Sequence, residues 1–131
     1  MSTTVRPFLM FEGRAEEAMN FYISLFADGK VTEMVKYGPG QPGPEGTVMI
    51  ASFVIAGQTV LCSDSFVKHG FTFTPSLSMF VTCEDEAQIK KLSAELASGG
   101  GELMPLGNYG FSRLFAWVND RFGVSWQLML P

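Results

Sequence analysis

The residues best suited to binding chemistry lie on the last predicted strand, residues 124–130. Its side chains alternate between an apolar set (Val124, Trp126, Leu128 and Leu130) and a mixed set (Ser125, Gln127 and Met129). We expect the apolar set to pack on the helices, which turns Gln127 toward a cleft. The amide of Gln127 then offers a donor pair and an acceptor to a small ligand, or it satisfies a neighbouring backbone group.

The preceding predicted strand carries an arginine beside two aromatic residues, because Arg113, Phe115 and Trp117 share one of its faces. A guanidinium next to aromatic rings suits a carboxylate or a planar ligand. The alternative is a surface salt bridge with the aromatic rings buried behind it. Tyr109, in the loop before this strand, and Tyr37, in the other half of the chain, are further candidates for closing over a ligand.

A second group of reactive residues follows an earlier strand, where Cys62 and Asp64 lie close to the only histidine, His69. A reactive thiol needs a nearby cation to lower its pKa. The alternative is an inert, buried cysteine, since cysteine is among the most buried residue types. Asp64 and His69 together are a candidate general base, the alternative being an exposed loop histidine.

The elements that must position these residues begin with a predicted helix at 15–26. Its apolar arc covers more than half of the helix circumference, which indicates a helix between two layers or against a second subunit. A short strand, 7–11, precedes it, and strands follow at 30–37, 47–55 and 59–62. The strand at 47–55 is apolar on both faces, so we expect it to be covered on both sides.

This order is then repeated. Residues 76–83 predict a strand, Thr82 and Asp85 a capping box, 87–97 a helix with Ile89, Leu92 and Leu96 as its core positions, and 102–105, 113–118 and 124–130 three further strands. The sequence therefore predicts an α+β fold made of two βαβββ modules, 6–64 and 76–131, within a single domain over 1–131. Such modules form a cupped sheet around a shared cleft, with the helices outside.

Composition limits the function classes. Of 131 residues, 47% are hydrophobic and only 17% are charged, below the roughly 25% typical of soluble domains. We therefore expect a homodimer, with the 15–26 helix and the outer sheet edges as candidate interfaces. The net charge of −4 without a basic cluster argues against binding to nucleic acid or to a membrane. Two cysteines without metal-type spacing and no visible secretion signal predict free thiols in the cytoplasm.

The glycine-rich segment 38–46, GPGQPGPEG, is predicted to be a turn-rich loop. Its prolines remove the amide donors that a phosphate-binding loop needs, and no Lys-Ser or Lys-Thr pair follows. The functional alternative is a mobile lid over a ligand.

Three stretches carry a family resemblance: PFLMFEGRAEEAMNFYISLF at 7–26, TVMIASFVIAGQ at 47–58 and DRFGVSWQLML at 120–130. Together with the βαβββ repeat, they resemble the PhnB-like (demethylubiquinone methyltransferase-like) branch of the vicinal oxygen chelate superfamily. That superfamily includes glyoxalases, bleomycin-resistance proteins and extradiol dioxygenases. The resemblance implies the glyoxalase-like fold over nearly the whole chain.

The resemblance also implies where a divalent metal would be held by His and Glu side chains from four strands. Those positions fall on Pro7 and Gln127, with Cys62 and Ser78 near the other two. These side chains do not make a set of donors for zinc, iron or manganese, so we expect no metal site and no cofactor. We do not expect the methyltransferase activity of the branch's label either. The only glycine-rich turn, 38–46, is broken by prolines and leads into a strand.

The sequence thus predicts a small-molecule binding protein or a metal-independent enzyme of this superfamily, whose reaction is not specified. Its partner is a small organic ligand, and Gln127, Arg113, Trp117 and Cys62 line the cleft. The alternative is a metal-dependent lyase, a dioxygenase-type enzyme or a methyltransferase of the same superfamily.

Overall fold

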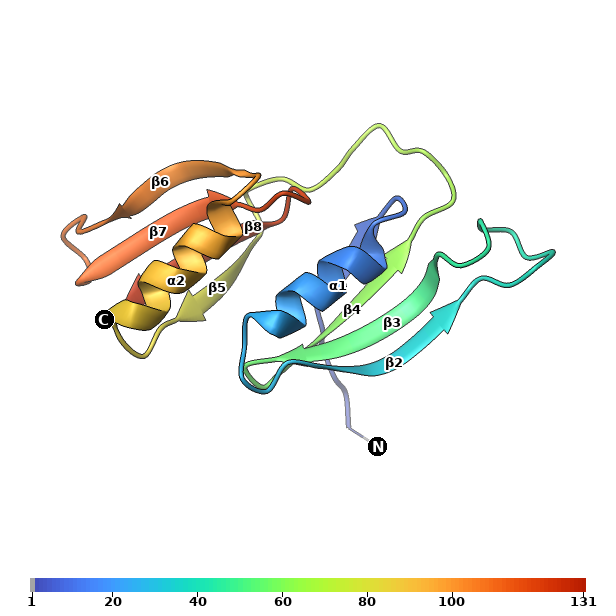
Figure 1. The fold of residues 1–131 in the computed structure, drawn as a ribbon, viewed down its shortest axis with the longest axis horizontal. Helices are drawn as coiled ribbons and strands as arrows, with labels where there is room; N and C mark the ends of the chain where they lie inside the picture. Colours follow the sequence, from blue (N-terminus) through green and yellow to red (C-terminus); the bar gives the residue numbers. More distant parts are fainter. Residues whose placement is uncertain (1) are drawn as a thin grey trace. The chain divides into compact units, whose positions relative to one another are not determined.

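The computed structural model describes residues 2–131, which fold as two units that meet between His69 and Gly70. The first unit contains β1 (Phe8–Phe11), α1 (Ala15–Ser24), β2 (Lys30–Lys36), β3 (Val48–Ile55) and β4 (Gln58–Asp64). The second contains β5 (Ser78–Thr82), α2 (Glu86–Ala97), β6 (Gly101–Gly107), β7 (Leu114–Asn119) and β8 (Ser125–Leu130). Each unit is therefore a βαβββ module, and the predicted α+β class and repeat are confirmed (Figure 1).

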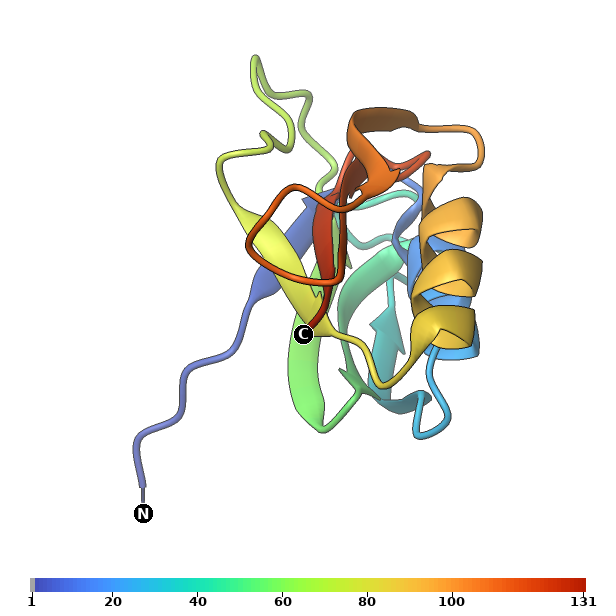
Figure 2. The ribbon, with the colours of Figure 1, turned by 90° about the vertical axis from the view of Figure 1, so that its left-hand side faces the viewer.

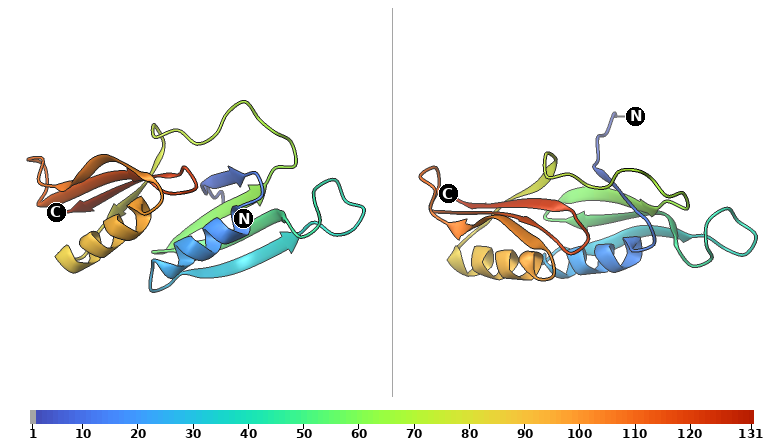
Figure 3. Two further views of the ribbon diagram at one scale, coloured as in Figure 1. Left: turned by 45° about the horizontal axis from the view of Figure 1, so that its top comes forward. Right: turned by 90° about the horizontal axis from the view of Figure 1, so that it is seen from above.

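The two sheets have the same topology. The strand orders are β1-β4-β3-β2 and β5-β8-β7-β6. In each sheet the first strand pairs in parallel with the last, and the other pairs are antiparallel. Within each unit the helix lies along one face of its own sheet, as the view from above shows (Figure 3). Over the described residues, the opposite face of each sheet carries no helix of its own unit.

The helix α1 buries a narrower stripe than its sequence predicts. Ala15, Ala18, Met19 and Tyr22 are buried, and the Tyr22 ring stacks on Phe53 of β3 at 6.2 Å. The helix ends at Ser24, and Phe21 and Phe26 are only half-buried. The predicted helix was two residues too long, and half-buried Phe21 and Ile23 leave part of the apolar arc uncovered within this chain, so its packing against a second subunit stays a prediction.

The second helix, α2, begins at Glu86, directly after its N-cap residue Asp85. The Asp85 side chain accepts a hydrogen bond from the Gln88 amide at 2.8 Å, and Gln88 Oε1 accepts one from the Glu84 amide at 2.6 Å. The capping box predicted at Thr82 was wrong, since β5 runs through Thr82 and the Cys83 amide still donates to the Met129 carbonyl of β8. The predicted core positions Ile89, Leu92 and Leu96 are buried.

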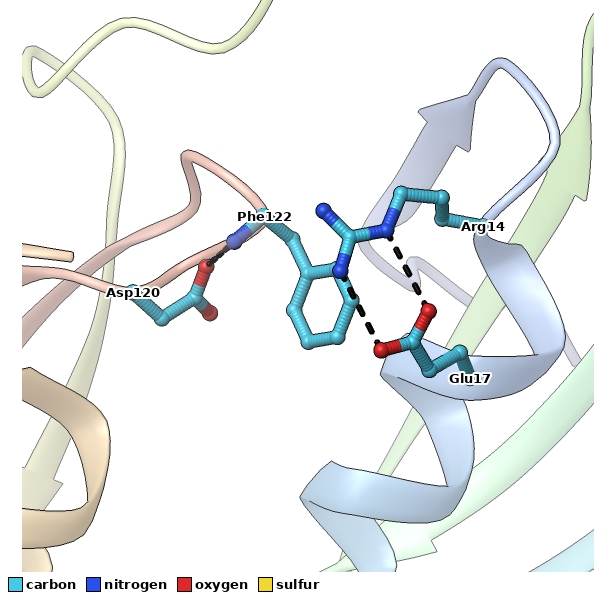
Figure 4. Close-up of polar contacts among 4 residues, drawn as sticks. All are labelled: Arg14, Glu17, Asp120 and Phe122. Carbon is cyan, nitrogen blue, oxygen red and sulfur yellow. Dashed lines mark hydrogen bonds and ion pairs between the residues drawn. The ribbon is translucent and has the colours of Figure 1, made fainter. Parts of the chain in front are cut away.

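Two buried carboxylates hold the ends of strands. Asp64, 3% exposed, accepts hydrogen bonds from the amides of Gly13, Ala15 and Val48 at 2.8, 2.9 and 3.0 Å. It therefore joins the end of β4 to the start of α1 and the start of β3, and it supplies the cap that Arg14 does not. Arg14 instead forms a two-pronged pair with Glu17 on the exposed first turn of α1 (Figure 4).

Asp120, like Asp64, accepts hydrogen bonds from backbone amides, here in the turn between β7 and β8. Its Oδ1 accepts from the Phe122 amide at 2.8 Å (Figure 4) and from the Val124 amide at 3.0 Å. Its Oδ2 accepts from Nε1 of Trp126 at 2.9 Å. The indole of Trp126 is thereby fixed in the core on the α2 side of the sheet.

Several strand limits differ from those predicted. The strand β6 extends to Gly107, β7 begins at Leu114 rather than at Arg113, and residues 2–7 run as an extended segment away from β1 (Figure 2). On β3, Phe53 and Ile55 are buried while Ser52 and Val54 are half-exposed, so within this chain the strand is not equally covered on both sides. No helix within residues 2–131 combines the length and apolar character needed to cross a membrane.

Candidate functional site

The strand pairing of the second unit gathers the predicted ligand residues on one face of its sheet. Gln127 of β8 pairs with Phe80 of β5 on one side and with Trp117 of β7 on the other. Because paired residues share a face and side chains alternate along a strand, this face is the one opposite α2. We call it the Gln127 face; its central residues are Ser78, Phe80, Phe115, Trp117, Ser125 and Gln127.

A chain of hydrogen bonds crosses this face over three strands. Trp117 Nε1 donates to Ser125 Oγ at 2.9 Å, and Ser125 Oγ lies 2.7 Å from Ser78 Oγ. Gln127 Nε2 donates to Ser78 Oγ at 3.3 Å. A residue of β5, Ser78, thus fixes the Gln127 side chain, and a residue of β8, Ser125, fixes the Ser78 hydroxyl.

The Gln127 amide keeps unused hydrogen-bonding capacity. Its amide carries two N–H donors and a carbonyl acceptor, and Ser78 is its only hydrogen-bond partner among residues 2–131. One N–H and the Oε1 acceptor therefore remain available on a half-exposed side chain. The prediction that Gln127 lies opposite the helix-packing side agrees with the burial of Trp126, Leu128 and Leu130.

Three aromatic rings close one end of the Gln127 face. The β6–β7 loop folds Phe111 over Phe115, with ring centroids 4.9 Å apart, and Tyr109 contacts both rings. The Tyr109 hydroxyl donates to the Pro105 carbonyl, which fixes the loop. Phe115 is consequently 5% exposed, although its strand position places it beside Trp117 on the same face.

Arg113 forms no salt bridge among residues 2–131, and its role in ligand binding stays a prediction. It precedes β7, is exposed, and its Nε donates to the Pro131 carbonyl at 2.7 Å. Along an extended chain it lies roughly 13 Å from the Trp117 position, four residues away. Arg113 therefore lies at the end of an interior strand, away from the middle of the Gln127 face.

Cys62 lies in the core of the first unit. It is 0% exposed and shares the α1 side of β4 with Val60 and Asp64, whereas Leu61 and Ser63 point to the other face. Burial, and then the charge of Asp64, raise the pKa of the Cys62 thiol to about 12. The thiol is thus protonated at neutral pH, and its position does not suit the lining of an open ligand surface.

The other two candidates of the first half also have structural partners. Asp64 accepts from three backbone amides, and the His69 ring nitrogen Nε2 lies 2.8 Å from Ser65 Oγ; these contacts do not support the general-base pairing of Asp64 with His69. Tyr37 packs its ring against Phe66 and over Gly43, where a Cβ atom would meet the ring at 2.4 Å. Tyr37 therefore anchors the 38–46 loop.

The positions that the superfamily uses for metal ligands do not fit a metal here. Ser78 and Gln127 are neighbours, but a hydroxyl and a neutral amide are weak ligands for zinc, iron or manganese. Among residues 2–131, no three His, Cys, Asp or Glu side chains converge in a way that could hold a metal ion.

The strand–helix turns at which a methyl-donor cofactor could bind have their backbone amides occupied by side chains of the chain itself. The glycine turn between β1 and α1, at Gly13, has the order that such a turn needs, but Asp64 already occupies the amides of Gly13 and Ala15. The start of α2 is capped by Asp85 and Gln88 in the same way. Both helix starts thus carry a carboxylate or amide of the chain itself where an anionic cofactor group would bind.

Comparison with solved structures defines the class of protein. A glyoxylase/bleomycin resistance protein/dioxygenase domain from Frankia sp. EAN1pec has a TM-score of 0.66 at 15% identity and covers 99% of this chain and 98% of its own. A variant of the fosfomycin resistance protein FosX from Listeria monocytogenes, complexed with Mn(II) and a dihydroxypropylphosphonic acid, has a TM-score of 0.65 at 10% identity, with coverage of 98% and 92%. At these identities the two likenesses are in the fold, so this chain has the fold of a glyoxylase/bleomycin resistance protein/dioxygenase domain.

The family profile assigns the chain more closely than the fold does. The chain belongs to the family described as 3-demethylubiquinone-9 3-methyltransferase, whose profile matches residues 3–129. A PhnB protein from Bacillus cereus is 52% identical, covers 98% of this chain and 100% of its own, and has a TM-score of 0.96. The search of curated proteins found no match. The resemblance predicted from the three sequence stretches is confirmed.

Proposed function

We propose that this chain binds a small organic molecule on the Gln127 face. The observation that carries the proposal is the hydrogen-bond chain from Trp117 through Ser125 and Ser78 to Gln127, which leaves the Gln127 amide oriented and partly unused. Ligand sites are mostly apolar surfaces with a few placed polar groups, and this face has that composition. Phe80 and Trp117 beside the amide supply the apolar part.

The metal-dependent and methyltransferase alternatives receive less support. Ser78 and Gln127 are neutral where the superfamily places metal ligands, and the turn at Gly13 is closed by Asp64. The FosX relative is described with Mn(II), but at 10% identity it carries the fold alone. We therefore favour binding, or catalysis without a metal, over metal chemistry.

We also propose that the chain works as a homodimer in the cytoplasm. Low charge and exposed large apolar side chains on the outer strands β1 and β2, such as Phe8 and Val35, 51% and 42% exposed, support a partner surface. The mass of the native protein in native mass spectrometry tests the dimer.

The binding proposal is tested with Nile red, a neutral dye whose fluorescence rises in apolar surroundings. Gln127→Lys places a charge between Phe80 and Trp117, and we expect it to weaken dye binding about tenfold, because a charge on an apolar surface must be desolvated when the dye covers it. The matched control is Gln58→Lys at the exposed β3–β4 turn, which should leave binding unchanged. Equal binding by both variants and the native chain would overturn the proposal.

A further inference from the structure

We propose that the ligand of the Gln127 face is a neutral, flat molecule with a hydrogen-bond acceptor and a donor on one edge, as in a lactam. This inference rests on the proposed function and specifies its ligand class. It comes from three features of the face: the state of the Gln127 amide, the absence of charge around it, and the aromatic residues on either side.

The Gln127 amide is complementary to such an edge. Ser78 Oγ takes one N–H, so that Oε1 and one N–H remain on the same planar group. A ligand that offers both an acceptor and a donor can satisfy both. A ligand with only an acceptor or only a donor leaves half of the amide unpaired when it covers the site, which costs free energy.

The charge distribution selects against ions. The strand residues that alternation places on this face are Ser78, Phe80 and Thr82 of β5, Phe115, Trp117 and Asn119 of β7, Ser125, Gln127 and Met129 of β8, and Gly101, Met104 and Gly107 of β6. None of these described side chains is charged. A carboxylate bound at Gln127 would lose its water for a single amide N–H, because Arg113 lies before the start of β7, four residues from Trp117, and its Nε donates to the Pro131 carbonyl.

The neighbours of Gln127 favour a flat molecule. Phe80 and Trp117 are its partners in the register on the two adjacent strands, and strands in a sheet are about 4.8 Å apart. In the register, Gln127 therefore lies between two aromatic residues. An aromatic or conjugated ring can contact both of them while its edge reaches the amide.

The experiment compares four probes by ¹H–¹⁵N NMR: 2-quinolone, N-methyl-2-quinolone, naphthalene and 2-naphthoate. The reporter is the indole N–H of Trp117, which belongs to the hydrogen-bond chain, and the indole N–H of Trp126, bound to Asp120 on the α2 side, is the internal control. We expect 2-quinolone to shift only the Trp117 signal. We expect it to bind about tenfold more tightly than the N-methyl compound or 2-naphthoate, the factor for a hydrogen bond to the donor.

Gln127→Met keeps the length of the side chain and removes its amide. The tenfold preference for 2-quinolone over its N-methyl derivative should disappear in this variant, while the affinity for naphthalene stays unchanged. If the four probes bind the native chain equally, or 2-naphthoate binds most tightly, the ligand class is overturned and the binding surface stands. If no probe shifts the Trp117 signal, the proposed function fails together with the inference.

Discussion

Replacing Asp64 with alanine is expected to lower the free energy of unfolding by about 4 kcal/mol, because three backbone N–H groups lose their acceptor and an unsatisfied buried donor costs about 1–3 kcal/mol. The amides of Gly13, Ala15 and Val48 belong to three different elements of the first unit. The carboxylate is 3% exposed, so water replaces it poorly. Urea unfolding followed by circular dichroism gives the free energy.

The matched control is Asp28→Ala. Asp28 also accepts from two backbone amides, those of Ala56 and Gly57 at 2.7 and 2.8 Å, but this turn is exposed and water can take over both bonds. We expect a clearly smaller loss of stability. Asp64→Asn tests the acceptor role itself, since its amide nitrogen must face at least one of the three donors, and it should lose part of the same stability. Equal stabilities of the Asp64→Ala and Asp28→Ala variants would contradict the assignment of Asp64 as a structural carboxylate.

Gly100→Ala is expected to lower the free energy of unfolding by about 3 kcal/mol, the upper part of the range for forcing extra atoms into a packed site. A Cβ atom at Gly100 would lie 2.0 Å from the Asn119 carbonyl oxygen. That oxygen belongs to the backbone of β7, so the strand itself would have to move. Thermal unfolding and urea unfolding of the variant measure the cost.

The adjacent residue supplies the control. Gly101→Ala meets no atom within 4 Å and should change the stability by less than about 0.5 kcal/mol. Gly29 is the counterpart of Gly100 in the first unit, and its Cβ would lie 1.9 Å from the Ile23 carbonyl oxygen. Gly29→Ala should therefore behave like Gly100→Ala. Full stability of both variants would show that the close backbone contacts at Gly29 and Gly100 are not required.

Local periodicity was sufficient to predict the repeat and the Gln127 face. The 124–130 strand alternates over its whole length, so the separation of Gln127 from Trp126 and Leu128 follows from the sequence, and so do the core positions of α2. The stretch 59–62 was too short to fix which side Cys62 faces. Its place in the core depends on the register with β1 and β3.

The long-range hydrogen bonds could not be predicted from the sequence. Asp64 meets Gly13 and Ala15 across 51 and 49 residues, and Ser78 meets Ser125 across 47. Neither the helix cap supplied by Asp64 nor the serine link has a local signature. Asp120 is different, because an aspartate two residues before its amide partner is a common turn motif, and it could have been recognised.

The most direct test of a metal-free ligand surface is the effect of Mn²⁺, a paramagnetic ion, on the two tryptophan indole signals. Mn²⁺ held next to Gln127 would broaden the Trp117 N–H signal, which is part of the same hydrogen-bond chain, far more than the Trp126 signal on the other side of the sheet. We expect one equivalent of Mn²⁺ to leave the two signals equally intense. Selective loss of the Trp117 signal would contradict the account and restore a metal site.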